Sequence, residues 1–148
     1  MNEPRFIPAD AGIIQPMIEL ARCSKLQRII IAGSKSREFR SELHRRGFVR
    51  VATTASCGLP AGQYDVALVD WRQHSVKAFE TTLDWLMDFL SPTGVLVVWV
   101  DPQEPADNRK LRAAIEKHGL VVEAGTVRDH GCAVTARRRE TKPIAKVA

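Results

Sequence analysis

The chain has 148 residues, of which 45% are hydrophobic and 26% are charged, as in one ordinary globular domain. No apolar run approaches the roughly 20 residues of a membrane-spanning helix, and no secretory signal is visible, so we expect a cytoplasmic protein with no membrane partner. Of the formal net charge of +5, residues 137–148 carry most, with five Lys or Arg residues against one Glu. Because no aromatic residue is interleaved with these charges to stack on bases, a solvated tail is favoured over nucleic-acid binding.

Short β-branched runs and amphipathic helical patterns alternate along the chain. A leading helix capped by Asp10 contains Pro16, which either kinks the helix or makes it begin near Gln15. Three consecutive isoleucines then predict a strand buried on both faces. The elements expected from there are strand 28–32, helix 37–46, strand 48–54, strand 64–69, helix 76–90, strand 95–100, helix 107–118, strand 120–127 and strand 132–138. Residues 57–62 and 91–94 are rich in Gly and Pro and are expected to be turns.

Strands that alternate with helices of roughly 10 to 15 residues require parallel pairing with right-handed crossovers. We therefore expect an α/β fold, a Rossmann-like three-layer sandwich with a mostly parallel sheet of about six strands and a C-terminal antiparallel hairpin. The expected organisation is an N-terminal helical extension over residues 1–27, the Rossmann-like domain over 28–139 and a flexible basic tail over 140–148.

In such sheets a ligand binds beyond the carboxyl ends of the strands, where the strand order switches. The candidate ligand-binding residues at these ends are Gly33, Ser34, Lys35, Ser36, Arg37, Asp70 and Asp101. Unpaired backbone donors at the start of the 37–46 helix favour a small anionic ligand. Alternatively, Ser36 only caps that helix while Lys35 and Arg37 point to water, and the two aspartates cap loops rather than act as acid and base.

The cysteines and histidines indicate no further chemistry. Cys23, Cys57 and Cys132 lie far apart and form no C-x-x-C motif, which argues against a disulfide framework or a zinc site. The four histidines show neither metal-ligand spacing nor the partners of a catalytic triad. We expect no metal and assign no catalytic residue.

Four features together resemble the class I S-adenosylmethionine-dependent methyltransferases over roughly residues 28–138. These are the first strand with its loop, the strand ending at Asp70, the 90–100 passage with Pro92 and Gly94, and the closing hairpin. The resemblance implies the family's fold. It also implies a cofactor loop, which in that family is a strand with an acid near its end followed by three alternating glycines.

The cofactor loop of this chain departs from the family's pattern. Only Gly33 is kept, because Ile31 stands at the place of the acid, and Lys35 and Arg37 stand at the second and third glycines. The family's second acid, which binds ribose hydroxyls, should fall near residue 53 or 54, where both residues are threonine. The segment before Tyr64 is also too short for the family's usual helix and third strand, so one edge of the sheet is expected to be missing.

A weaker resemblance is to response-regulator receiver domains, in which Asp70 would be the phosphoacceptor. Phosphoryl transfer in those domains needs Mg²⁺ held by acids at the end of the first strand. This chain has Ala32, Gly33 and Ser34 there. The closing antiparallel hairpin does not suit that fold either.

These departures predict a non-catalytic binding or regulatory module with no cofactor, S-adenosylmethionine being disfavoured. The alternatives are a divergent S-adenosylmethionine-dependent methyltransferase, which is the activity expected if the chain is an enzyme, and a binder of a small anion or nucleotide through residues 34–40. A homodimer is a further expectation, because a missing sheet edge leaves backbone groups that a second copy can cover.

Overall fold

The structure is a computed structural model, and the residues described are 11–33, 36–53, 62–71, 75–101, 105–128 and 131–138. Within these ranges four helices and six strands alternate along the chain. In order they are α1 (Ala11–Ala21), β1 (Ile29–Gly33), α2 (Ser36–Arg45), β2 (Val51–Thr53), β3 (Tyr64–Asp70), α3 (Val76–Leu86), β4 (Leu90–Val100), α4 (Pro105–Lys117), β5 (Leu120–Arg128) and β6 (Gly131–Arg138).

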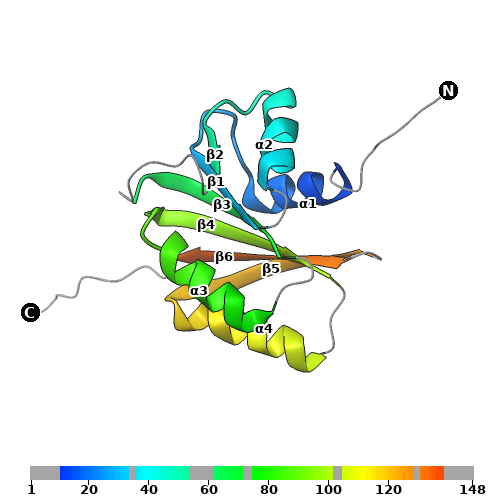
Figure 1. Ribbon diagram of the computed structural model, residues 1–148, viewed down its shortest axis with the longest axis vertical. Helices are drawn as coiled ribbons and strands as arrows, with labels where there is room; N and C mark the ends of the chain where they lie inside the picture. Colours follow the sequence, from blue (N-terminus) through cyan, green and yellow to red (C-terminus); the bar gives the residue numbers. More distant parts are fainter. Residues whose placement is uncertain are drawn as a thin grey trace, which may run out of the picture.

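The six strands form one mixed sheet in the order β2-β1-β3-β4-β6-β5. The pairs between β2 and β1, β1 and β3, and β3 and β4 are parallel, whereas β6 runs antiparallel to both β4 and β5. The crossover through α4 therefore carries the chain past the position that β6 later fills (Figure 1). The predicted mostly parallel sheet with a closing antiparallel hairpin is confirmed.

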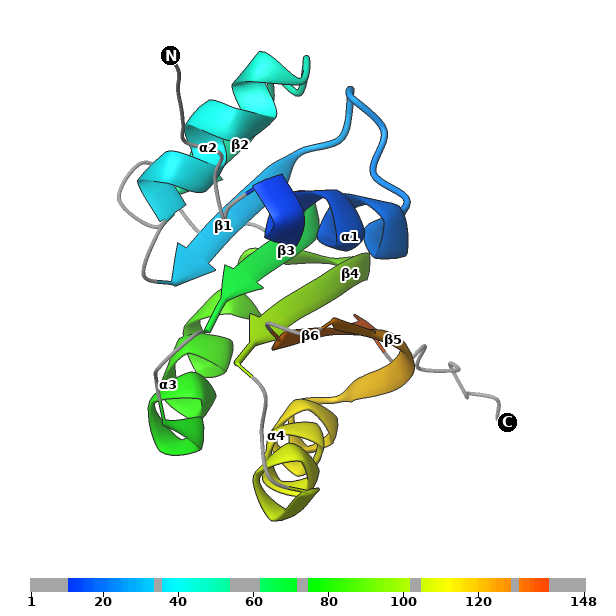
Figure 2. The same ribbon diagram turned by 90° about the vertical axis from the view of Figure 1, so that its right-hand side faces the viewer.

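Helices cover both faces of the sheet and make a three-layer sandwich (Figure 2). Side-chain alternation along β1 shows the two layers, because Ile29 and Ile31 pack in one apolar cluster while Ile30 and Ala32 pack in the other. The first cluster contains the buried side chains of α1 and α2, and the second contains those of α3 and α4. A strand buried on both faces is what the isoleucine run predicts.

At one edge of the sheet lies β2, a strand of three residues that pairs with β1. β3 follows β2 in the chain, and no strand of the described residues lies beyond β2 at this edge. Although a longer strand over 48–54 was expected, Phe48 instead closes the end of α2. Its N–H donates to the carbonyl of Leu43, and Gly47 takes the positive φ of 96° that ends a helix in this way.

The first helix is continuous from Ala11 through Pro16, so a helix starting near Gln15 was the wrong alternative. Pro16 is itself buried, as are Ile13, Ile14 and Met17 on the same helix. Burial of these apolar groups against the sheet offsets the hydrogen bond that a proline removes from a helix interior.

The strongest strand begins earlier than its Gly and Pro residues predict. Tyr64 pairs with Leu90 and Val66 pairs with Val95, so the chain between Leu90 and Val95 is an irregularity within β4 and not a separate turn. The helix before it correspondingly ends at Leu86.

The guanidinium of Arg138, at the end of β6, stabilises this passage. It donates to the carbonyl oxygens of Met87 at 2.5 Å, Ser91 at 3.1 Å and Leu90 at 3.3 Å. These contacts join residues about 50 positions apart in sequence, so no local pattern could predict them.

The start of α4 also differs from the expected range of 107–118, because the helix begins at Pro105 and Asp107 lies in its first turn. Proline suits the first helical position, where its missing N–H is not needed, and an acid in the first turn favours the helix dipole. No helix among the described residues is long and apolar enough to span a membrane.

Candidate functional site

Three parallel strands bring the predicted site residues to one end of the sheet, at the carboxyl ends of the strands. The strand order switches between β1 and β3, because the chain passes from β1 to β2 on one side and from β3 to β4 on the other. Across this switch point Gly33 pairs with Asp70, and Asp70 pairs with Trp99. Asp101 follows directly after β4. The carboxyl ends of β1, β3 and β4 therefore form the place where a ligand is expected in such a fold.

Gly33 ends β1 in a conformation that only glycine adopts easily. Its φ is +113°, and an added Cβ would lie 2.1 Å from the carbonyl oxygen of Asp70. The close approach of the two strand ends thus requires glycine at this position, whether or not a ligand binds. Packing between β1 and β3 is sufficient to explain the one glycine that the loop keeps.

The two candidate aspartates differ in accessibility. Asp70 is fully buried, and strand alternation places it with Val66 and Leu68 on the face covered by α1 and α2. Asp101 is half-buried. Both aspartates also interact with other residues of the chain. Asp101 is therefore the more accessible of the two carboxylates.

Trp71 anchors the chain where it leaves β3. Its backbone N–H donates to the carbonyl of Trp99 at 2.8 Å, and its indole N–H donates to the carbonyl of Ser75 at 2.8 Å. The Trp71 ring packs against Phe79 with 5.5 Å between the ring centroids. Ser75 in turn caps α3 by accepting from the N–H of Ala78 at 3.1 Å. These contacts hold the residue that follows Asp70 in place.

The start of α2 contains the next candidate residues along the chain. Ser36 is the first residue of the helix rather than the residue before it, so the predicted cap at Ser36 is not seen. Ser36 is half-buried and Arg37 is exposed, while Glu38 places an acid in the same turn. Ser34 and Lys35, the other two predicted residues of this loop, lie outside the described residues.

The two positions where the resemblance places acids lie side by side. Ile31 pairs with Thr53 across the parallel strands β1 and β2. Ile31 is fully buried in the cluster beneath α1 and α2, and Thr53 is half-buried. At this corner the sheet therefore presents an apolar and a hydroxyl side chain.

Cys132 lies at the same end of the sheet, although no pattern in the sequence indicates it. The antiparallel register pairs Cys132 with Val100, at the carboxyl end of β4. The thiol is half-buried, and burial raises its pKa, partly opposed by the positive charge of Arg112. Only knowledge of the hairpin register could have placed Cys132 near Asp101. Among the described residues, no group of three or more His, Cys, Asp or Glu is arranged to hold a metal ion.

No protein-family model matches the sequence, and no curated protein matches it. Solved structures do match. A ribosomal protein L11 methylase from Lactobacillus delbrueckii subsp. bulgaricus superposes with a TM-score of 0.66 at 10% identity, covering 93% of this chain and 91% of the methylase. The 1,6-didemethyltoxoflavin-N1-methyltransferase of Burkholderia thailandensis, bound to S-adenosylhomocysteine, gives 0.62 at 14% identity, with 89% and 79% covered. The [4+2]-cyclase SpnF gives 0.62 at 13% identity, with 90% and 82% covered.

At these identities the likeness establishes the fold, and the sequence-based resemblance is confirmed at that level. It also corrects one expectation. The prediction that the chain has no cofactor is wrong by this comparison, because structures that share its fold are S-adenosylmethionine-dependent methyltransferases, some of them bound to S-adenosylhomocysteine or sinefungin. That expectation was based on Ile31, Lys35 and Arg37 in the cofactor loop and on the threonines at residues 53 and 54.

Proposed function

Because the chain has the class I methyltransferase fold, we propose that it binds S-adenosylmethionine at the carboxyl ends of β1, β3 and β4, as a divergent methyltransferase. The observation that carries this proposal is the convergence of Gly33, Asp70 and Asp101 at the switch point of the sheet. When bound, the cofactor supplies a methyl group on a positively charged sulfur, which a nucleophile on the substrate can attack.

The described residues offer groups of the right charge for the polar ends of this cofactor. Its carboxylate suits the start of α2, where backbone N–H groups lack helical partners and Arg37 adds a positive charge. Its ammonium group or its ribose hydroxyls suit the half-buried carboxylate of Asp101. The fit differs from the family's pattern because Ile31 and Thr53 stand where the two acids are expected. The carboxylates near the site therefore come from the ends of β3 and β4.

The experiment is a calorimetric titration of the purified chain with S-adenosylmethionine and with S-adenosylhomocysteine. The proposal predicts binding of both compounds and a weakening of about tenfold in Asp101→Asn, because a charged hydrogen-bond acceptor is lost. Asp88→Asn is the matched control, since Asp88 is an exposed aspartate that precedes β4 at the opposite edge of the sheet. Absence of binding to the wild-type chain by either compound would overturn the proposal.

A second candidate is a non-catalytic binding or regulatory module that keeps the ligand site without transferring a methyl group. The fully buried Ile31 favours it, because an apolar residue replaces an acid of the family's cofactor loop. One protein with this fold is described as a cyclase, so the fold alone does not determine the reaction. The chain would be excluded as a non-catalytic module if, with S-adenosylmethionine and fractionated cell extract as the source of methyl acceptor, it formed S-adenosylhomocysteine above the amount that the extract forms alone. Ligand binding without such turnover in any fraction supports this candidate.

The third candidate, a site for a small anion or nucleotide at the start of α2, depends on the exposed Arg37. It predicts binding of inorganic phosphate or ATP that is lost in Arg37→Glu. Arg109→Glu is the control, because it places the same charge change in the first half of α4. Equal binding by the two variants would remove this candidate.

A further inference from the structure

A second surface lies at the opposite end of the strands from the candidate site, where the chain enters β1 and β2. Two loops form it, residues 22–28 before β1 and residues 46–50 before β2. They lie side by side, because the N–H of Ile29 donates to the carbonyl of Arg50 at 2.9 Å. We name the exposed side chains of these two loops the entry patch. It lies at the amino ends of β1 and β2, away from the candidate cofactor site.

The entry patch is basic. Neither loop contains an aspartate or a glutamate. Its exposed basic side chains are Arg22, Lys25 and Arg28 in the loop before β1 and Arg50 in the loop before β2. Because the chain without its tail is nearly neutral in total, this charge is produced by the fold, which gathers basic residues from two loops at one end.

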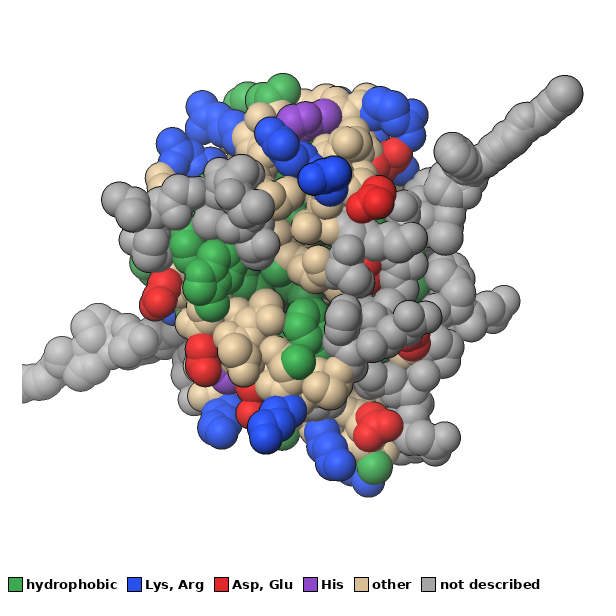
Figure 3. Space-filling view, viewed as in Figure 1, with side chains coloured by type: hydrophobic (Ala, Val, Ile, Leu, Met, Phe, Trp, Pro, Cys, Tyr) green, Lys and Arg blue, Asp and Glu red, His purple; other side chains and the backbone are tan. Residues whose placement is uncertain are grey.

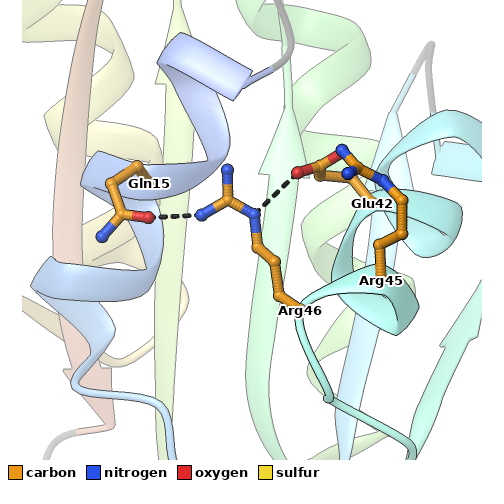
Figure 4. A network of polar contacts seen from close by, with 4 residues as sticks. All are labelled: Gln15, Glu42, Arg45 and Arg46. Carbon is orange, nitrogen blue, oxygen red and sulfur yellow. Dashed lines mark hydrogen bonds and ion pairs between the residues drawn. The ribbon is translucent and has the colours of Figure 1, made fainter.

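The acid nearest in sequence to the second loop is already paired. Glu42 forms ion pairs with Arg45 and with Arg46, at 2.7 Å for Arg46 Nε, and Arg46 also donates to Gln15 on α1 (Figure 4). These contacts join α1 to α2 and compensate the charge of Glu42. The half-buried carboxylate of Asp65 also contacts the first loop, where it accepts from the backbone N–H of Arg28 at 3.0 Å. With four exposed Lys or Arg side chains against this one acid, the entry patch keeps an excess of positive charge.

The tips of the two loops are apolar and exposed. Leu26 is 74% exposed and Val49 is 68% exposed, the highest values among the large hydrophobic side chains that the structure describes. Each belongs to one of the two loops. In Figure 3 hydrophobic atoms appear at the upper end of the molecule beside α2, with Lys and Arg side chains on both sides. Single exposed aliphatic residues are common, but two at neighbouring loop tips within a basic surface form a defined feature.

We propose that the entry patch binds the anionic surface of a lipid bilayer, with Leu26 and Val49 entering the headgroup region. Basic side chains are attracted to acidic headgroups, and aliphatic side chains gain by entering the boundary with the acyl chains. Nucleic acid fits less well, because Phe48, the aromatic residue of these loops, is buried and the exposed aliphatic tips would have no partner. A second copy of the chain fits less well because two basic surfaces repel each other.

This contact is peripheral, since no helix among those described can span a membrane. The expectation of no membrane partner was based on the lack of an apolar run long enough to span a membrane. That consideration does not address a loop surface that forms only when β1 and β2 lie side by side. The proposal is independent of what binds at the carboxyl ends of the strands.

The test is sedimentation of the full chain with vesicles of phosphatidylcholine alone and with vesicles that also contain phosphatidylglycerol. We expect binding to the anionic vesicles only, weakened by salt. Leu26→Ser with Val49→Ser, and separately Lys25→Glu with Arg50→Glu, should each lower partitioning by about tenfold or more. The control is Arg109→Glu with Lys110→Glu, which makes the same change of net charge on the exposed face of α4. Circular dichroism checks that each variant is folded.

Three results would overturn the proposal. The first is that the wild-type chain fails to bind anionic vesicles. The second is that the α4 control loses binding as strongly as the charge variant of the entry patch. The third is that the serine variant binds vesicles as the wild type does, which leaves only a non-specific attraction to polyanions. In that case a duplex RNA added to the assay would compete equally for the wild type and the serine variant, as expected of a non-specific attraction to polyanions.

Discussion

Replacement of Gly33 by alanine tests how the candidate site is built. Gly33 has a positive φ of 113°, and its added Cβ would meet three backbone atoms of Asp70, the oxygen at 2.1 Å, the carbon at 2.8 Å and the nitrogen at 2.9 Å. A backbone neighbour cannot move away as the end of a flexible side chain can. Gly33→Ala must therefore either separate β1 from β3 at their carboxyl ends or strain both strands.

The cost has two parts. A residue with a Cβ at such a φ costs about 1–3 kcal/mol, and forcing an extra carbon into a packed site costs about 1–3 kcal/mol more. We expect Gly33→Ala to lower the free energy of unfolding by about 4 kcal/mol. Gly119→Ala is the matched control, because Gly119 also has a positive φ, 84°, but nothing lies within 4 Å of its added Cβ. Only the backbone part applies there, about 1 kcal/mol.

Urea denaturation followed by circular dichroism measures both variants against the wild type, and an unchanged slope would show that the difference lies in folded-state stability. The account requires Gly33→Ala to lose clearly more stability than Gly119→Ala. Equal losses in the two variants would show that β1 and β3 do not approach each other as closely as described. In that case packing between β1 and β3 would not be what requires glycine at position 33.

Three further outcomes are expected. Urea denaturation should show a loss of about 2 kcal/mol of unfolding free energy in Arg138→Met, because three carbonyl oxygens lose a charged donor. Arg137→Met removes one exposed ion pair with Glu123 and should change the unfolding free energy by under about 0.5 kcal/mol. Burial alone would raise the pKa of Glu42, but hydrogen bonds from Arg46 and Arg45 outweigh burial and lower this pKa. The difference in unfolding free energy between wild type and Glu42→Gln should therefore be full at neutral pH and disappear as pH falls through the folded-state pKa. A difference that grows in acid would contradict this sign. Burial raises the pKa of the Cys23 thiol to about 11. At pH 8 iodoacetamide should therefore modify Cys23 in the folded chain on the order of 100-fold more slowly than it modifies an exposed thiol. Equal rates, measured by mass spectrometry, would contradict the burial of Cys23.

The fold could be predicted where local pattern and burial agree. The isoleucines of β1 are buried on both faces, as a β-branched run of that length indicates, and the alternation of strands and helices was enough for the parallel order. The start of β4 could not be predicted, because it depends on Tyr64 pairing with Leu90 and on Arg138 binding the carbonyls between α3 and β4. Contacts between residues so distant in sequence leave no local signal.

The candidate site could be predicted only as a set of strand ends. Gly33, Asp70 and Asp101 meet because parallel strands end at one edge, which follows from topology. The register that places the Asp70 carbonyl against Gly33, and Cys132 beside Val100, is a property of pairing and is absent from the sequence. The expectation of no cofactor was based on individual residues of the loop after β1 and of the end of β2, and the methyltransferase structures that share the fold contradict it.

The central claim is that this fold still binds S-adenosylmethionine despite its altered loop. Calorimetric titration of the wild-type chain and of Asp101→Asn tests it directly, supported by thermal melting with cofactor. The account predicts heat of binding for the wild type, weaker binding for Asp101→Asn, and a stabilisation of about 2.7 kcal/mol when the cofactor is present at 100 times its dissociation constant. No heat and an unmoved melting curve at millimolar cofactor would contradict the claim.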